Sequence, residues 1–192
     1  MIKRAELLAL IFVFLVIVIF SGCSTKQKTM GQGMVSVVAQ NVVRIAGIKA
    51  MKDANLTAVK GKKTFVKTTG FADDFNRGFI DNLVRSKAED AGCLLVNENS
   101  AEIIIEVAVN SAGNDLGATK IPLLSNSTRT EGTVDLSLTL RDNNSGQRIS
   151  KQSIIGHSKY EQGEIIGIQG SGQYYVKEKA KFIKVDNPSS YN

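Results

Sequence analysis

Alternating hydrophobic and polar positions predict β-strands in the middle of the chain. Apolar side chains occupy every second position of residues 101–110 and 132–141: Ile103, Ile105, Val107 and Val109 in the first stretch, Val134, Leu136, Leu138 and Leu140 in the second. A period of two places each set on one face of a sheet. The turn-forming run from Asp142 to Gly146 predicts a hairpin, with residues 147–160 as the return strand. Such clean alternation favours an antiparallel sheet with one face covered and the other in water.

Two further stretches repeat with the period of a helix. Residues 34–51 place valine, isoleucine and alanine at steps of three and four, and residues 75–91 do the same with a phenylalanine-rich stripe. Asp73 and Asp74 stand at the start of the second helix, where the helix dipole favours negative charge, and Gly92 is placed to end it. We expect the first helix to cover a face of the sheet; the alternative is a helix that lies on a membrane surface.

The remaining segments complete an α+β fold. Residues 64–69 and 93–96 predict short strands, and residues 173–185 predict a final strand or short helix. The polar stretch 111–130 predicts a long connection that interrupts the sheet and is a candidate functional loop. Four glycines in residues 163–172 predict a flexible loop. We therefore expect a mostly antiparallel sheet of about five to six strands, with two helices packed on one face.

The start of the chain has the pattern of an export signal. Lys3 and Arg4 precede an apolar run from Leu7 to Phe20, which is shorter than the roughly 18–20 residues that cross a bilayer comfortably. The sequence Phe20-Ser21-Gly22-Cys23 follows and resembles the lipobox of bacterial lipoproteins, although that family usually has leucine where this chain has Phe20. The resemblance implies cleavage before Cys23, diacylation of Cys23 and acylation of the new amino terminus.

This resemblance implies how the chain is divided into segments and where in the cell it is located. We expect a signal peptide in residues 1–22, a lipid anchor and tether in 23–33, one α+β domain in 34–185 and a frayed tail in 186–192. In the proteobacterial lipoproteins that the chain resembles, an aspartate directly after the cysteine favours retention in the inner membrane. Ser24 at that position implies the periplasmic side of the outer membrane, or the cell membrane where the organism has only one.

The charge of the chain suggests anionic partners. Loss of residues 1–22 removes Lys3, Arg4 and Glu6 and lowers the formal charge from +6 to +5. An exported basic protein meets anionic lipid, lipopolysaccharide or cell-wall polymer, whereas nucleic acid is not expected in that compartment. Two groups of lysines are candidates for such a contact: Lys60, Lys62 and Lys63 in one, and Lys177, Lys179, Lys181 and Lys184 in the other.

Candidate catalytic and metal-binding residues are scattered. His157, the sole histidine, lies in the predicted return strand beside Ser158 and near Ser153, and the chain has no G-x-S-x-G nucleophile motif. Cys93 lies in an apolar run and is interpreted as a small buried hydrophobic residue. Glu161 and Glu164 form the nearest approach to a carboxylate pair, without the spacing of a calcium loop. We therefore predict no catalytic residue, metal site or cofactor.

The order of elements in residues 60–160 resembles the small α+β domains of outer-membrane assembly and secretion lipoproteins, such as the curli-secretion lipoprotein family. The resemblance implies a non-catalytic binding or scaffold component of an envelope assembly with a protein partner. One alternative is a lipoprotein that handles lipid or lipopolysaccharide, which predicts a deep apolar groove between helix and sheet. The other is an envelope hydrolase, which needs His157 or the Glu161/Glu164 pair to converge in one cleft.

Overall fold

The computed structural model describes residues 25–27, 37–70, 74–121, 125–165 and 168–186. The predicted signal peptide, the lipobox with Cys23, Ser24, Asp73 and the end of the predicted tail lie outside the described residues. None of the helices within these ranges has the length and apolar content needed to cross a membrane.

A single sheet organises the described part of the chain, and it contains nine strands there rather than the five or six predicted. The strands are β1 (Thr25–Gln27), β2 (Lys63–Gly70), β3 (Leu94–Leu95), β4 (Ile103–Ile121), β5 (Ser125–Asp142), β6 (Arg148–Ile165), β7 (Ile168–Gln169), β8 (Gln173–Glu178) and β9 (Lys181–Val185). Their order is β3-β2-β4-β5-β6-β8-β9, with β1 paired to β4 and β7 paired to β6. The pairs of β2 with β3 and β4 are parallel, and the other pairs are antiparallel.

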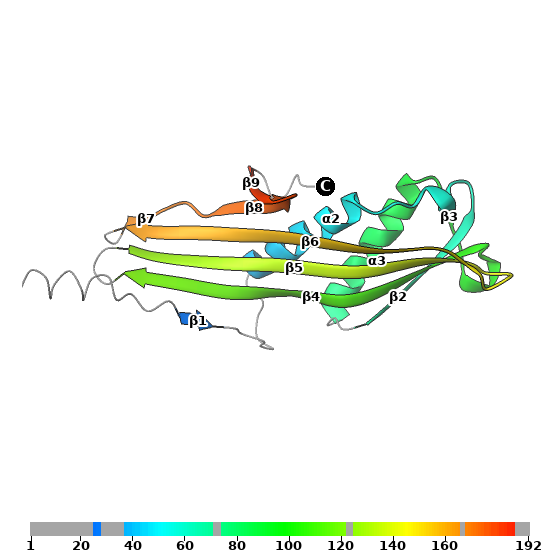
Figure 1. The fold of residues 1–192 in the computed structure, drawn as a ribbon, viewed down its shortest axis with the longest axis horizontal. Helices are drawn as coiled ribbons and strands as arrows, with labels where there is room; N and C mark the ends of the chain where they lie inside the picture. The colour runs from blue at the N-terminus through cyan, green and yellow to red at the C-terminus, as the bar shows by residue number, and fades with distance from the viewer. Residues whose placement is uncertain (1–24, 28–36, 71–73, 122–124, 166–167, 187–192) are drawn as a thin grey trace, which may run out of the picture.

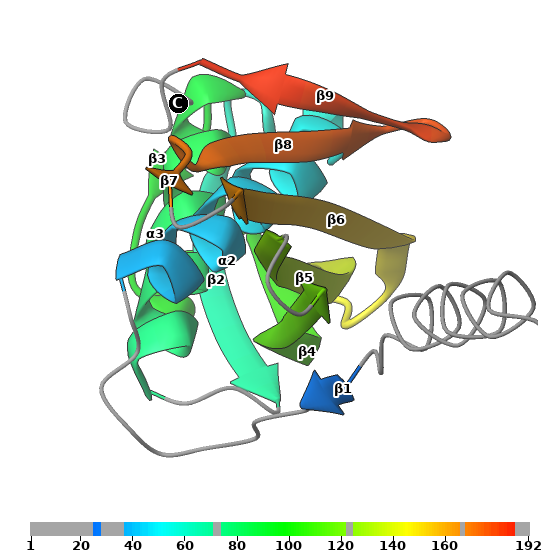
Figure 2. The same cartoon turned by 90° about the vertical axis from the view of Figure 1, so that its left-hand side faces the viewer.

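Two α-helices accompany the sheet and confirm the α+β class. They are α2 (Val37–Lys52) and α3 (Asp74–Asp90), close to the predicted ranges, and two short 3-10 turns span Thr57–Val59 and Glu98–Ser100. Gly92 follows α3 with φ 88°, as expected of a residue that ends a helix. Figures 1 and 2 show both helices on the same side of the sheet.

The alternating residues of β4 and β5 form the core, as predicted. All eight of them are at most 4% exposed. The backbone of α2 lies directly against the sheet, because a Cβ atom added to Gly132 or Gly156 would overlap backbone atoms of Val42 or Ala46. The Ser158 hydroxyl donates a hydrogen bond to the Val42 carbonyl at 2.5 Å. Helix α2 is therefore a buried layer of the fold, and the alternative of a helix on a membrane surface is wrong.

The predicted connection at 111–130 is wrong. Outside residues 122–124, which the structure does not describe, this stretch continues β4 and β5, with Ser111 paired to Asp135 and Leu116 paired to Thr130. In Figure 1 these ends of β4–β6 extend past α2, so no helix covers them. Without a covered face, the residues have no reason to alternate, and the register shift between Val109 and Ser111 also changes the parity of the pattern.

The predicted glycine loop is also largely strand. Strand β6 runs to Ile165, β7 pairs with it, and the Gly170 amide bonds to the Gly163 carbonyl at 2.8 Å. Strands β8 and β9 then form a hairpin whose Val176 and Val185 pack against Ile45 of α2. Thr25–Gln27, inside the segment expected as a tether, forms β1.

Candidate functional site

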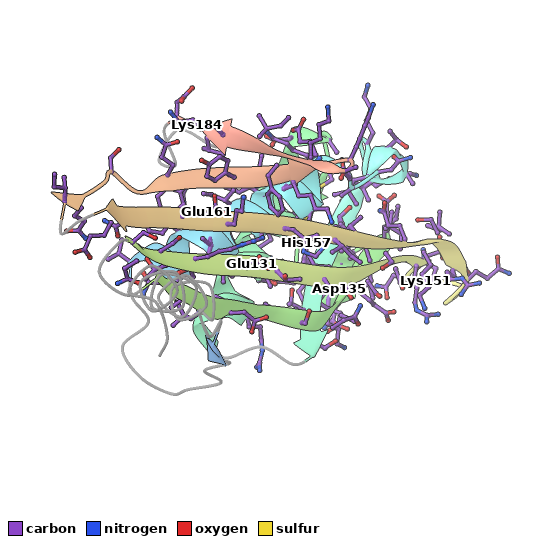
Figure 3. All side chains as sticks on the ribbon, turned by 60° about the vertical axis from the view of Figure 1, so that its left-hand side comes forward. Glu131, Asp135, Lys151, His157, Glu161 and Lys184 are labelled. Atoms are coloured by element: carbon purple, nitrogen blue, oxygen red, sulfur yellow. The ribbon has the colours of Figure 1, made fainter. Side chains whose placement is uncertain are left out.

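One face of the sheet carries no helix, and we call it the uncovered face. It consists of the side chains of β2, β4, β5 and β6 that alternate with the buried ones: Lys67, Thr69, Glu106, Ala108, Asp135, Ser137, Thr139, Ser153, Ile155 and His157. Figure 3 looks toward this face, where Glu131 and Asp135 of β5 lie beside Glu161 and His157 of β6. The face is broad because four strands contribute to it, and it is polar because small hydroxyl-bearing residues occupy its centre.

Hydrogen bonds between neighbouring strands fix many of these side chains. The Asn110 amide donates to Asp135 at 3.0 Å and to the Ser137 hydroxyl at 3.1 Å. The Arg141 guanidinium donates to Glu106 at 2.8 Å. A shallow hollow of about 200 Å³ lies nearby, lined by Lys67, Thr69, Glu106, Ala108, Ser137 and Thr139. The uncovered face is therefore ordered before it meets any partner.

Lys159 links β6 to the β8–β9 hairpin. Its ammonium lies 4.7 Å from the ring centres of both Tyr175 and Phe182, and it donates to Glu161 at 2.8 Å. Cation–π contact and the ion pair together hold this side chain, which is only 14% exposed. The lysine therefore holds the hairpin beside β6 through contacts on the uncovered face. Lys159 and the two aromatic residues were not among the candidate site residues predicted from the sequence.

His157 does not belong to a catalytic set in the part of the chain that the structure describes. Its Nδ1 lies 3.2 Å from the Thr133 hydroxyl of the neighbouring strand. Ser158 points to the opposite face of the sheet, and Ser153 is four residues away, which is about 13 Å along a strand. Burial lowers the pKa of His157, the charge of Lys177 lowers it further, and Glu131 and Asp135 act in the opposite direction.

The two glutamates do not converge either. Glu161 is paired with Lys159 on the uncovered face. Glu164 lies three residues further along β6, and because side chains alternate along a strand, it faces the opposite side of the sheet. No group of three or more potential metal ligands lies close together among the described residues. The hydrolase alternative required such convergence, and the described geometry does not provide it.

Cys93 lies at the end of α3, directly before β3, and packs partly against the core. Burial raises the pKa of its thiol, a hydrogen bond with the Thr64 side chain partly offsets this effect, and the charge of Glu89 adds to it. A thiol with a raised pKa carries little thiolate at neutral pH and is a poor nucleophile. The interpretation of Cys93 as a structural residue fits this environment.

A groove opens where the β8–β9 hairpin separates from β6. Strand β8 pairs with β6 only from Gln173 to Val176, and its next residues pair with β9 alone. The groove has a volume of about 490 Å³ and is lined by Lys49, Asp53, Ile155, His157, Lys177, Glu178 and Lys179. The sequence predicted Lys177 and Lys179 as members of a basic cluster. No pattern in the sequence predicted that they line a groove with Lys49 and His157.

The other lysine group has a different setting. Lys62 pairs with Glu102 at 3.3 Å, and Lys60 and Lys63 are exposed beside the start of β2. Lys184, at the far end of β9, pairs with Asp186 at 3.6 Å. Only Lys177 and Lys179 of the predicted basic residues line the groove.

Comparison with known proteins gives little guidance. No family model matches the chain, and no curated protein matches it. Among solved structures, the chain is similar to the crystal structure of lipoprotein GNA1162 from Neisseria meningitidis, with 12% sequence identity and a TM-score of 0.38 over 50% of this chain and 82% of that chain. A TM-score of this size carries no conclusion about the function of this chain.

Proposed function

We propose that the chain is a lipoprotein of the cell envelope that binds a partner protein and catalyses no reaction. Cys23 carries its acyl chains and holds it on the periplasmic side of the outer membrane. The lipobox-like sequence before Cys23 supports the anchor. An anchored domain works at high effective concentration near its membrane, which suits a component of an envelope assembly.

The uncovered face is the observation that supports binding most strongly. It extends over β2, β4, β5 and β6, and cross-strand bonds such as that of Asn110 to Asp135 order its side chains. Binding to a surface that is already ordered costs little conformational entropy. Catalysis would instead need a nucleophile and a base within hydrogen-bond reach, whereas Ser158 and His157 point to opposite faces.

Metabolic labelling tests the anchor. Cells that express the full chain are grown with radioactive palmitate, beside cells that express Cys23→Ala. We expect label on the wild-type chain in the outer-membrane fraction, and an unlabelled Cys23→Ala chain that leaves this fraction. A wild-type chain without label, or a variant that stays bound, would overturn the lipoprotein assignment.

Site-specific photo-crosslinking tests the binding surface. A benzophenone amino acid replaces Ser137 on the uncovered face, and the matched variant carries it at Ser86, an exposed serine of α3. We expect discrete crosslinked species of higher mass from position 137 and none from position 86. Equal crosslinking at both positions, or none at 137, would show that the uncovered face is not the contact surface.

A further inference from the structure

The outer edge of β6 is open over half of its length. On one side β6 pairs with β5 from Arg148 to Ile165. On the other side, its pairs among the described residues are limited to Ser158–Glu161 with β8 and Glu164–Ile165 with β7. On this side, the outward-directed backbone N–H and C=O groups of residues 148–157 therefore pair with no other strand among the described residues. Such an edge is a template for an added strand.

The groove described above surrounds this edge. Lys49 and Asp53 line it from α2 and the residue that follows, Ile155 and His157 line it from the uncovered face, and Lys177–Lys179 close it from the β8–β9 hairpin. Residues from α2, from β6 and from the hairpin line the groove together, so it lies along the open edge of β6. The Gln152 amide exchanges hydrogen bonds of 3.0 and 2.9 Å with the backbone of Asn55, which holds the loop after α2 beside β6. Ser153–His157 remain open between this loop and β8.

Charge indicates what the groove accepts. The lining holds three lysines against two carboxylates, Asp53 and Glu178, and Lys49 already pairs with Asp53 at 3.3 Å. No ion pair joins Lys177 or Lys179 to a carboxylate in the described part of the chain. Lysines also protect open edges against pairing with identical chains. In a chain whose formal charge is +5 after loss of residues 1–22, such lysines disfavour a second copy and favour an acidic strand.

The conformation of Lys179 adds an independent observation. It lies in the β8–β9 turn with φ 54°, a left-handed conformation that is less favourable for lysine than for glycine. Among the described non-glycine residues, Lys179 is the one with a positive φ. Strained positions of this kind often mark functional sites. Here the strained residue places an ammonium group at the groove.

From this arrangement we propose that Ser153–His157 of β6 bind an extended acidic segment of a partner protein as an added β-strand. The segment lies in the groove, pairs its backbone with the open edge and directs carboxylates to Lys177 and Lys179. Lys177 lies on the uncovered face, because its neighbour Val176 packs against Ile45 of α2, so the carboxylates project on that face and the alternating apolar side chains of the segment face the side of α2. This inference specifies the partner contact of the binding function proposed above and rests on that function.

Model peptides test the added strand on the full chain, purified in mild detergent. The probe is a fluorescein-labelled seven-residue peptide in which valine alternates with glutamate. Two companion peptides replace glutamate with lysine or carry N-methyl groups on alternate backbone amides. We expect fluorescence anisotropy to detect binding of the acidic peptide alone. Hydrogen exchange measured by mass spectrometry should slow at residues 153–157 when this peptide is bound.

Variants of the chain separate charge from folding. Lys179→Asn removes the ammonium while it suits the left-handed conformation, so the double variant Lys177→Glu/Lys179→Asn should keep its thermal stability and bind the peptide roughly tenfold more weakly. Lys63→Glu makes the same two-unit charge reversal as Lys177→Glu at a lysine outside the groove, and it should change affinity less than about twofold.

Several results would overturn the added-strand proposal. They are equal binding of the N-methylated or lysine peptide, protection outside residues 153–157, and displacement by inorganic phosphate or by phosphatidylglycerol vesicles. Concentration-dependent protection of 153–157 without peptide would assign the edge to a second copy and would also overturn it. These outcomes are measured separately from the palmitate and crosslinking results, so a failure of the added-strand proposal can be distinguished from a failure of the proposed function.

Discussion

The charge state of His157 is set by its neighbours on two strands. Burial lowers its pKa most, and Lys177 on β8 adds to this effect, while Glu131 and Asp135 on β5 oppose it. An unperturbed histidine has a pKa of about 6.5, so a lower pKa keeps the imidazole ring of folded His157 mostly neutral at pH 7. The Thr133 hydroxyl can then donate to the unprotonated Nδ1 at 3.2 Å.

The lowered pKa makes stability depend on pH through this one residue. As the pH falls below about 6.5, the unfolded chain binds a proton that folded His157 resists, so the free energy of unfolding decreases. The free energy of unfolding stops decreasing once the pH is below the pKa of folded His157, and this residue causes no decrease above about pH 7.5. We expect urea unfolding at pH 7.5, 6.0 and 5.0 to show this decrease in the wild type and a smaller one in His157→Gln.

The Lys177→Ala variant measures how much the charge of Lys177 adds to the effect of burial on the pKa of His157. Loss of that ammonium should raise the pKa of His157 toward its ordinary value, as measured by NMR titration of the imidazole ring. The same variant should narrow the pH range over which stability falls. A His157 pKa at or above that of an unfolded peptide would contradict the environment described here.

At the scale of elements, the contact of α2 with the sheet depends on two glycines. A methyl group at Gly156 would overlap the Ala46 carbonyl of α2, so Gly156→Ala must push the helix off β6. We expect a loss of about 3 kcal/mol in the free energy of unfolding, near the upper end of typical overpacking effects. Thermal and urea unfolding measure this loss directly.

Gly113 of β4 provides the matched control. No atom lies within 4 Å of a Cβ added there, and its φ lies outside the left-handed range. Gly113→Ala should therefore be neutral or stabilising by up to about 1 kcal/mol. Equal losses in the two variants would show that strand propensity, and not contact with the helix, decides the role of Gly156.

The sequence predicted elements well where a helix covers the sheet. Under α2 and α3, one face of β4 and β5 must be apolar, so the alternation through Val107 and Leu138 is clean. Beyond the helices both faces contact water, and residues such as Leu116 and Thr128 are exposed without a periodic pattern. The parallel pairing of β2 with β4 had a usable signal, because a strand, helix and strand in that order favour a parallel crossover.

At the scale of the whole molecule, the candidate site arises from contacts between distant parts of the chain. Helix α2 reaches β8 through Asn41 and Tyr174, 133 residues apart, and the loop after α2 reaches β6 through Asn55 and Gln152, 97 residues apart. No local pattern encodes where β8 separates from β6. The basic character of Lys177 and Lys179 was therefore predictable from the sequence, whereas the groove that they line was not.

The same long-range contacts predict the effect of removing β8 and β9. A chain that ends at Gly172 loses Val176, Val185 and Tyr174, which cover Ile45. Burial of large apolar side chains contributes roughly 1.5–3 kcal/mol each, so we expect the free energy of unfolding to fall by at least about 3 kcal/mol. The truncation also opens β6 at Ser158–Glu161. We expect the shortened chain to self-associate in analytical ultracentrifugation, because a longer unprotected edge favours strand pairing.

A shorter deletion separates the hairpin from the tail. Removal of residues 187–192, predicted from the sequence to be frayed, should leave both the melting temperature and the sedimentation of the full chain unchanged. If the long truncation melts and sediments like this control, the hairpin neither supports α2 nor protects the edge. If it melts early but stays monomeric, Lys151 and the other charges along β6 protect the edge without the hairpin. Repulsion between the positive charges along β6 would then prevent two copies of the chain from pairing through this edge. The same positive charge leaves the edge available to an acidic partner.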